Sequence, residues 1–481
     1  MQAVADRGRG EVASAPTEAP AQSAGSSQLR LPVTIAALGI VLIAFNQIDI
    51  ATLPISDLVF FVLAGSIWLL MLTGKADRFV PSRFRRSSPR ILTASIVLVL
   101  FATISSFRSW DPADSMNSVV RLAYLTMLWF WMLRCLSVNR RTIALLLRAW
   151  RWGVVITSVV VILANAGAFK LGVPNAEGRQ TGWFGHPNDL GGYLATSIPL
   201  FVMATPVAIT ERKRFRALGR PVLLGTVVFG MSTAGSMSAF LGAAAGTFAA
   251  GLAFLLTGDS GGGRRRATHP LKLAGLVLLG VVGLVALART DTPLVERFTR
   301  LGEGDAYVSG SVDSRTDGNE QVINSFDQVL VIGRGLDTFA QQDLDLEIGV
   351  HNMYLKLVYE AGFIAALGLV FIVVFTLHQA WRLLVNTRST MLHRDICAVL
   401  GCIVAAVVFA NFQPTTIQRY YWLPIAMIQC YWALRRSELA SGQTEDELNA
   451  WSDPPDTRRR ALVASSSIRP GPGSDLVRAR G

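Results

Sequence analysis

The residues best suited to chemistry stand together in one stretch, residues 349–362. His351 and Asn352 come first, followed by Tyr354, and the apolar positions after them recur at helical spacing. A neutral histidine titrates near physiological pH and can serve as a general base. We therefore expect a helix that enters a bilayer and keeps His351 and Asn352 at its water-facing end. The alternative for His351 is a residue that merely caps the helix or hydrogen-bonds a loop. Glu360 is either a buried acid that pairs helices or part of the site.

Arginines upstream of this stretch are candidates for binding an anion. Residues 290–350 form the longest polar segment between two apolar runs, with twelve Asp and Glu between positions 291 and 347. Arg315 begins a predicted helical stretch. Arg334 lies between two glycines, which would let backbone amides approach a phosphate while the guanidinium binds it. A glycine turn with a chance arginine is the alternative. For Arg297 and Arg300 we favour pairing with acidic neighbours on a short amphipathic helix.

A second polar motif precedes another apolar run. It is the segment Gly182–Asn188, in which His186, Pro187 and Asn188 come last. The order is typical of a loop that ends in an asparagine N-cap. His186 and Asn188 are candidate substrate contacts, and the favoured alternative for His186 is a loop residue that merely precedes the asparagine cap.

Composition predicts a membrane protein that holds these residues in place. Of 481 residues, 51% are hydrophobic and only 16% are charged. A net charge of +12 would suggest nucleic acid in a soluble chain, but here the charges segregate between loops, so we expect no nucleic-acid partner. The four cysteines fall in or beside apolar runs without metal-ligand spacing, which favours packing.

We predict an all-α polytopic fold of about twelve transmembrane helices, counted at about 20 apolar residues per crossing. The predicted spans are 31–48, 52–73, 91–107, 118–136, 150–169, 189–209, 220–234, 237–257, 272–289, 361–384, 395–411 and 417–435. Basic residues concentrate after the second, fourth, sixth and eighth spans. The positive-inside rule then places both termini in the cytoplasm, residues 290–350 outside, and the chain in the cytoplasmic (inner) membrane.

The chain divides into five predicted regions. They are a disordered cytoplasmic tail without a cleavable signal (1–30), a transmembrane region of about nine spans (31–289), a long extracytoplasmic loop with short helices (290–350), a loop-exit helix with the last three spans (351–435), and a second disordered cytoplasmic tail (436–481).

These motifs resemble the superfamily of O-antigen ligases and O-antigen polymerases, which are membrane glycan-assembly enzymes. The resemblance spans roughly residues 90–435. It is carried by Gly182–Asn188, by the small-residue stretch Ser232–Ala245, by the Arg315 helix leading to Ile332–Phe339, and above all by the stretch from His351 to Gly362. One departure concerns Ser236–Ser238, where members of the family often carry an arginine and this chain has none.

The resemblance implies a fold similar to class-C glycosyltransferases and a metal-independent, inverting reaction without a cofactor. A glycan would pass from a polyprenyl diphosphate in the membrane lipid to a hydroxyl on a glycan or lipid acceptor. His351 would be the base or a hydrogen-bond donor to the diphosphate, and Arg315 and Arg334 would stabilise the leaving group. Asn352 and Tyr354 would orient the histidine or the sugar.

Two other classes remain open. A transporter or flippase of lipid-linked glycans would predict internal repeats and ionisable groups near the middle of the membrane, and we find no clear repeat. A non-enzymatic scaffold of envelope assembly would leave His351 and the loop arginines replaceable.

Overall fold

The computed structural model describes the chain in several stretches. They are residues 30–45, 49–50, 53–73, 88–137, 139–169, 178–203, 214–257, 292–302, 316–320, 322–337, 350–387 and 390–440. The predicted span at 272–289, Arg315 and most of both predicted tails lie outside the described residues.

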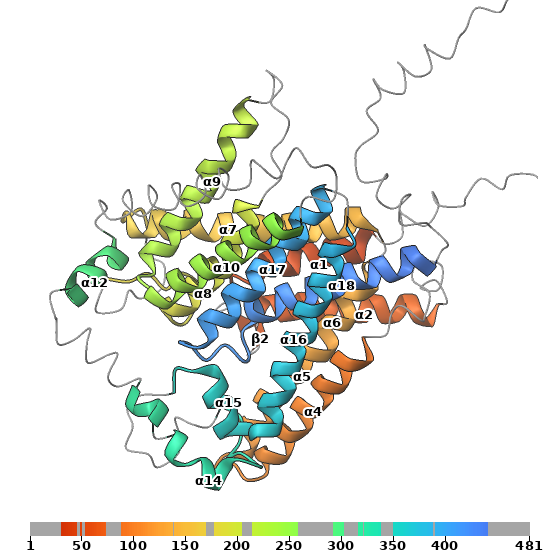
Figure 1. The fold of residues 1–481 in the computed structure, drawn as a ribbon, viewed down its shortest axis with the longest axis vertical. Helices are drawn as coiled ribbons and strands as arrows, with labels where there is room; N and C mark the ends of the chain where they lie inside the picture. The colour runs from red at the N-terminus through yellow and green to blue at the C-terminus, as the bar shows by residue number, and fades with distance from the viewer. Residues whose placement is uncertain are drawn as a thin grey trace, which may run out of the picture.

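The described residues fold into helices and one short antiparallel pair of strands (Figure 1). In chain order the elements are α1 (Arg30–Leu42), β1 (Asp49–Ile50), β2 (Leu53–Pro54), α2 (Ile55–Leu72), α4 (Pro89–Ser106), α5 (Pro112–Ala123), the π-helix η2 (Tyr124–Leu128), α6 (Trp129–Cys135), α7 (Arg140–Asn165), α8 (Pro187–Val202), α9 (Arg214–Thr233), α10 (Met237–Thr257), α12 (Pro293–Gly302), α14 (Phe326–Val329), α15 (Met353–Ala361), α16 (Phe363–Val385), α17 (Thr390–Ala410) and α18 (Arg419–Ala440).

The prediction of a helical membrane protein is confirmed in its coarse form. Six of the described helices are long and apolar enough to cross a bilayer: α2, α4, α7, α10, α16 and residues 391–410 of α17. Apart from 272–289, each of the remaining predicted spans also overlaps a described helix. The number of crossings stays a prediction, because several of those helices are shorter or more polar than a crossing usually requires.

Glycines set how closely the central helices pack. A Cβ on Gly246 of α10 would lie 2.4 Å from the Gly401 carbonyl oxygen of α17, and a Cβ on Gly192 of α8 would lie 2.4 Å from the Phe409 ring. Small residues let helix backbones approach closely. Such packing matters in a bilayer, because lipid tails are as apolar as the side chains and leave no hydrophobic driving force between helices. Helices α8, α10 and α17 therefore form one tightly packed unit (Figure 1).

Several helix ends meet at one end of this bundle, which we call the α15 end. There α18 begins beside the start of α2, through Arg419 and Asp57, and the start of α15 packs on the end of α17, through Tyr354 and Val407. Helices α4 and α16 run side by side toward the same region, where α14 and α15 lie (Figure 1). This arrangement places the start of α15 at the same end of the bundle as the starts of α2 and α18.

Candidate functional site

The head of α15 carries the two residues that the sequence singles out most strongly. Asn352 is the N-cap: its Oδ1 accepts hydrogen bonds from the backbone N–H groups of Tyr354 (2.9 Å) and Leu355 (3.1 Å). His351 immediately precedes the cap and is partly exposed. The positive end of the helix dipole thus points toward the surroundings of His351, a setting that favours an anion nearby.

Helix α15 is fixed at this end by α17 and by the loop of residues 411–418. The Tyr354 hydroxyl donates to the Val407 carbonyl at 3.3 Å, and the Thr415 hydroxyl donates to the Met353 sulfur at 3.1 Å. Burial raises the pKa of Tyr354 to about 12, so the phenol stays protonated and acts as the donor. These contacts make the position of His351 depend on the 411–418 loop.

The same loop connects to a buried arginine that the sequence reasoning missed. The Arg179 Nε donates to the Ala234 carbonyl at 2.8 Å, and an Nη donates to the Asn188 Oδ1 at 2.6 Å. The Asn188 amide in turn donates to the Gln413 Oε1 at 3.2 Å. We call these three side chains, Arg179, Asn188 and Gln413, the Arg179 network. It runs from the turn between α9 and α10 to the 411–418 loop, two residues from Thr415.

The Arg179 network lies at the turn where the sequence lacks the expected arginine. Gly235 in this turn has φ +60°, and a Cβ there would lie 3.1 Å from Pro293 and 3.2 Å from Arg179. An Nη of Arg297, on α12, donates to the Gly235 carbonyl at 3.3 Å. Two arginines from other segments therefore reach the turn. Arg300 pairs with Glu296 on the same helix, as predicted, and the acidic pairing predicted for Arg297 stays a prediction.

His186 has a different local role from the one predicted. It is the N-cap of α8, with its Nδ1 accepting from the Asn188 N–H at 3.1 Å, and Pro187 is the first helical residue. The prediction that Asn188 caps the helix is wrong. Proline fits the first helical position because that N–H has no helical partner anyway. The Asn188 side chain is therefore available for the Arg179 network.

Arg334 lies at the opposite end of α15 from His351. Its backbone N–H donates to the Tyr359 carbonyl (3.1 Å) and the Gly335 N–H to the Glu360 carbonyl (2.9 Å). The guanidinium donates to Gln328 at 2.6 Å and lies 5.6 Å from the Tyr359 ring centre. Tyr359 is eight residues beyond His351, or about 12 Å at 1.5 Å per residue. The structure thus does not bring Arg334 beside His351.

The glycines beside Arg334 serve close packing. A Cβ on Gly333 would lie 2.1 Å from the Glu360 carbonyl carbon, and Gly335 has φ +107°. Because the amides of Arg334 and Gly335 both bind carbonyls, the expectation that these amides approach a phosphate does not hold. The motif fastens the segment to the end of α15.

Glu360 is buried and belongs to a charged cluster on the side of α15. The Lys356 ammonium lies 2.9 Å from the Asp337 Oδ1 and 3.4 Å from the Glu360 Oε1. Burial raises the pKa of Glu360 to about 7, even though Lys356 opposes the shift. Burial also opposes the charge on Lys356, but the two carboxyl groups outweigh it and raise the pKa of Lys356. The cluster ties α15 to the segment that carries Arg334.

Two further polar pairs at the α15 end were missing from the sequence-based candidates. Asp57 of α2 and Arg419 of α18 form a two-pronged ion pair, with Nε to Oδ1 at 2.7 Å. The neighbouring Tyr420 donates to Asp189 of α8 at 3.2 Å. The sequence did contain a signal for the first pair: Asp57 is a carboxylate inside an apolar span, and such groups rarely lie there without a partner.

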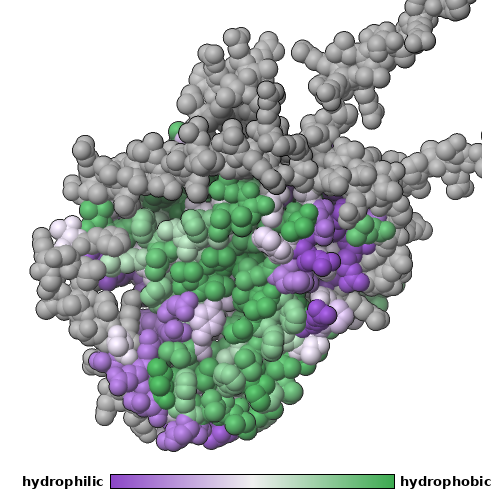
Figure 2. Space-filling model, in the orientation of Figure 1, coloured by the Kyte–Doolittle hydropathy of each residue, from purple (hydrophilic) through white to green (hydrophobic). Residues whose placement is uncertain are grey.

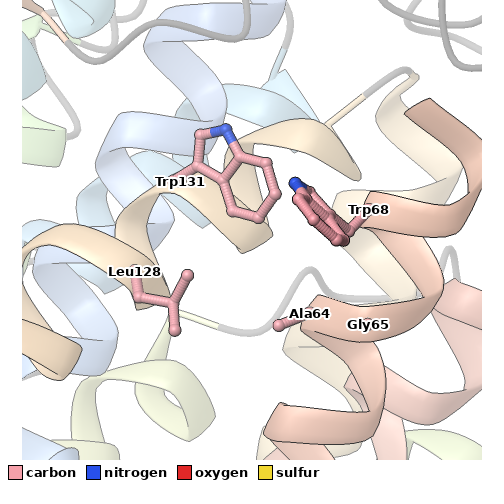
Figure 3. A pocket seen from close by; sticks show the side chains of 5 residues that line it. All are labelled: Ala64, Gly65, Trp68, Leu128 and Trp131. Atoms are coloured by element: carbon pink, nitrogen blue, oxygen red, sulfur yellow. The ribbon is translucent and has the colours of Figure 1, made fainter. Parts of the chain in front are cut away.

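A separate apolar pocket lies between α2 and η2–α6. It measures about 440 Å³ and is lined by Ala64, Gly65, Trp68, Leu128 and Trp131. Figure 3 shows the two indole rings facing each other on one side of the opening. These side chains include no acid, base or charge, so the pocket does not compete with the α15 end as a reaction site. Among the described residues, no three His, Cys, Asp or Glu are placed to hold a metal ion.

No family model and no curated protein matches the chain. The resemblance to glycan-assembly enzymes therefore stays a prediction that the geometry of the α15 end must support.

Proposed function

We propose that the protein transfers a glycan from a polyprenyl diphosphate to an acceptor hydroxyl at the membrane surface, as an O-antigen ligase or polymerase would. The observation that supports this best is the connection of the α15 head to the Arg179 network through the 411–418 loop. It gathers a histidine, a buried guanidinium and amide side chains at one end of a bundle of apolar helices. A lipid-borne diphosphate would be presented at that level.

The chemistry divides between a proton acceptor and stabilisation of the leaving group. The acceptor oxygen attacks the anomeric carbon, its proton passes to His351, and the bond from carbon to the diphosphate oxygen breaks with both electrons leaving on the diphosphate. Arg179 supplies the positive charge that the diphosphate needs as it departs, and Arg315, which lies outside the described residues, is the second proposed cation. Asn352 fixes the helix head through its cap, and Tyr354 fixes it against α17.

His351 has a second possible role, a hydrogen bond to the diphosphate in place of proton transfer. Substitution by glutamine separates the two, because an amide can donate that hydrogen bond but cannot accept the proton. If His351 is the base, His351→Gln is as inactive as His351→Ala. If it only binds the donor, His351→Gln keeps much of the turnover.

The test uses the purified protein in nanodiscs with a polyprenyl-diphosphate glycan, candidate acceptors, and a chelator in a parallel reaction. We expect release of polyprenyl diphosphate coupled to glycan transfer, abolished in His351→Ala and unaffected by the chelator. His378→Ala, an exposed histidine of α16, is the matched control and should be active. Extended products would indicate a polymerase and a single transfer a ligase. Binding of the donor without turnover on any acceptor, unchanged in His351→Ala, would instead favour the flippase.

A further inference from the structure

Large apolar side chains are exposed together where α4 ends and α16 begins. Phe107 and Trp110, which follow the end of α4, are 74% and 76% exposed, and Val331 is 61% exposed. Leu330 and Phe363 are each nearly half exposed. We call these five residues the tip patch. Exposure on this scale is unusual for aromatic side chains that face water.

Hydrogen bonds to backbone carbonyls hold the tip patch in a defined shape. The Phe363 N–H donates to the Leu330 carbonyl at 2.8 Å, and a guanidinium nitrogen of Arg108 donates to the Ile332 carbonyl at 3.2 Å. Gly362 has φ +88°, and a Cβ there would lie 2.5 Å from the Val331 carbonyl oxygen. The segment after α14 is thus fastened to the first residue of α16 and to the end of α4.

The tip patch continues the lipid-facing surface of two candidate membrane spans. On α4 the exposed apolar row is Ile96, Leu100 and Ile104, which leads directly to Phe107. On α16 the exposed apolar residues that follow Phe363 are Leu367, Val370, Phe371 and Val374. Figure 2 shows the apolar surface extending from the middle of the bundle down to the end where α14 lies.

We propose that the tip patch inserts into the boundary between lipid headgroups and acyl chains at one surface of the bilayer. Both spans leave the hydrocarbon core within a few residues of it, so its depth is set by α4 and α16. Tryptophan beside an exposed Arg108 suits this level, because the indole is amphipathic and the guanidinium meets lipid phosphates. A soluble partner would have to compete with the bilayer for a surface continuous with the spans.

One consequence concerns the polar segment that the sequence places outside the membrane. Residues 326–337 would return to the membrane surface instead of standing in water. Arg334, three residues after Val331, would then lie at headgroup depth. This inference is independent of the reaction proposed above.

The test measures how deep the patch lies in the full-length protein. A fluorophore whose emission reports polarity is attached through Val331→Cys, and in a second variant through Trp110→Cys. The four native cysteines are buried and serve as the unlabelled background. Asp317→Cys, at an exposed residue of the same predicted loop, is the control. Each variant is placed in phosphatidylcholine nanodiscs that carry a spin label near the headgroup, and quenching by the lipid is compared with quenching by dissolved iodide.

At Val331 and Trp110 we expect blue-shifted emission, strong quenching by the lipid label and weak quenching by iodide. An interfacial apolar face lies about 5–10 Å into the headgroup and acyl boundary, which is the depth of a shallow spin label. The Asp317 label should show the opposite pattern. The proposal is overturned if labels at Val331 and Trp110 match the Asp317 label in both measurements. Variants that fail to elute as the wild type does are replaced by Phe363→Cys.

Discussion

The Arg179 network makes a quantitative prediction about coupling between residues far apart in the chain. The hydrogen bond from Arg179 to Asn188 is 2.6 Å long, charged on the donor side and buried on both. A hydrogen bond to a charged group contributes about 1.5–3 kcal/mol, and a buried acceptor left without its donor costs about 1–3 kcal/mol. Arg179→Met, which also deprives the Ala234 carbonyl of this donor, should therefore lower the free energy of unfolding by roughly 2.5–6 kcal/mol.

A double-mutant cycle isolates the pair. Unfolding free energies of wild type, Arg179→Met, Asn188→Ala and the double variant are measured in detergent by denaturant titration. We expect a coupling energy of about 1.5–3 kcal/mol. Arg179→Lys should rescue little, because the compact ammonium cannot reproduce the two directions of the guanidinium fork.

The control cycle pairs Arg179→Met with Asn139→Ala in place of Asn188→Ala; Asn139 is the N-cap of α7. Val161 of α7 lies against Gly182, so Asn139 is some 22 residues away along the helix, about 33 Å at 1.5 Å per residue. Arg179→Met and Asn139→Ala should add to within about 0.5 kcal/mol. A coupling near zero between Arg179 and Asn188, or one as large with Asn139, would refute the reasoning.

Three further predictions concern the packing around α15 and the start of α2. Gly333→Ala should displace the segment before Arg334, because the new Cβ would lie 2.1 Å from the Glu360 backbone. Amide hydrogen exchange of residues 322–337 should therefore become faster. The control is Gly65→Ala, whose Cβ would have nothing within 4 Å and should leave the exchange rates unchanged. The pKa of Glu360 in the folded protein is about 7, above its ordinary 4.5, so the folded state favours the protonated acid. The free energy of unfolding should therefore fall by about 3 kcal/mol as the pH rises from 4.5 to 7. Glu360→Gln should flatten this dependence of the unfolding free energy on pH, and an unchanged dependence would contradict the assignment. Asp57→Asn should cost about 3–5 kcal/mol by leaving Arg419 buried without its carboxylate, whereas Asp57→Leu with Arg419→Met should recover most of that loss, and a double variant as unstable as the single one would count against this account.

Local chemistry was readable from the sequence where neighbours in the chain decide it. Asn352 caps the helix that the spacing after His351 predicts. The expectation that this same helix enters the bilayer is wrong: α15 ends at Ala361, Gly362 has φ +88°, and the candidate span α16 begins separately at Phe363. Cap and end depend on residues within a few positions of each other. The apolar runs likewise predicted the helices, because burial in lipid needs only composition and length.

Contacts between distant segments were not readable in this way. Asn188 meets Gln413 across 225 positions, and Arg179 reaches Ala234 across 55. The packing of α8 against α17, which brings these residues together, leaves no local pattern around either of them. The glycines beside Arg334 show the same limit. They did indicate a close approach to the backbone, but at Gly333 the group that approaches is the Glu360 backbone and not an anion.

We propose that the end of the bundle holding His351 performs glycan transfer. The most direct measurement is a single-turnover reaction with nanodisc-embedded protein and a radiolabelled polyprenyl-diphosphate glycan, comparing wild type, His351→Ala and His378→Ala. We expect labelled glycan on the acceptor with wild type and His378→Ala, and none with folded His351→Ala. Equal transfer by all three proteins, or donor bound by all three with no transfer, would contradict it.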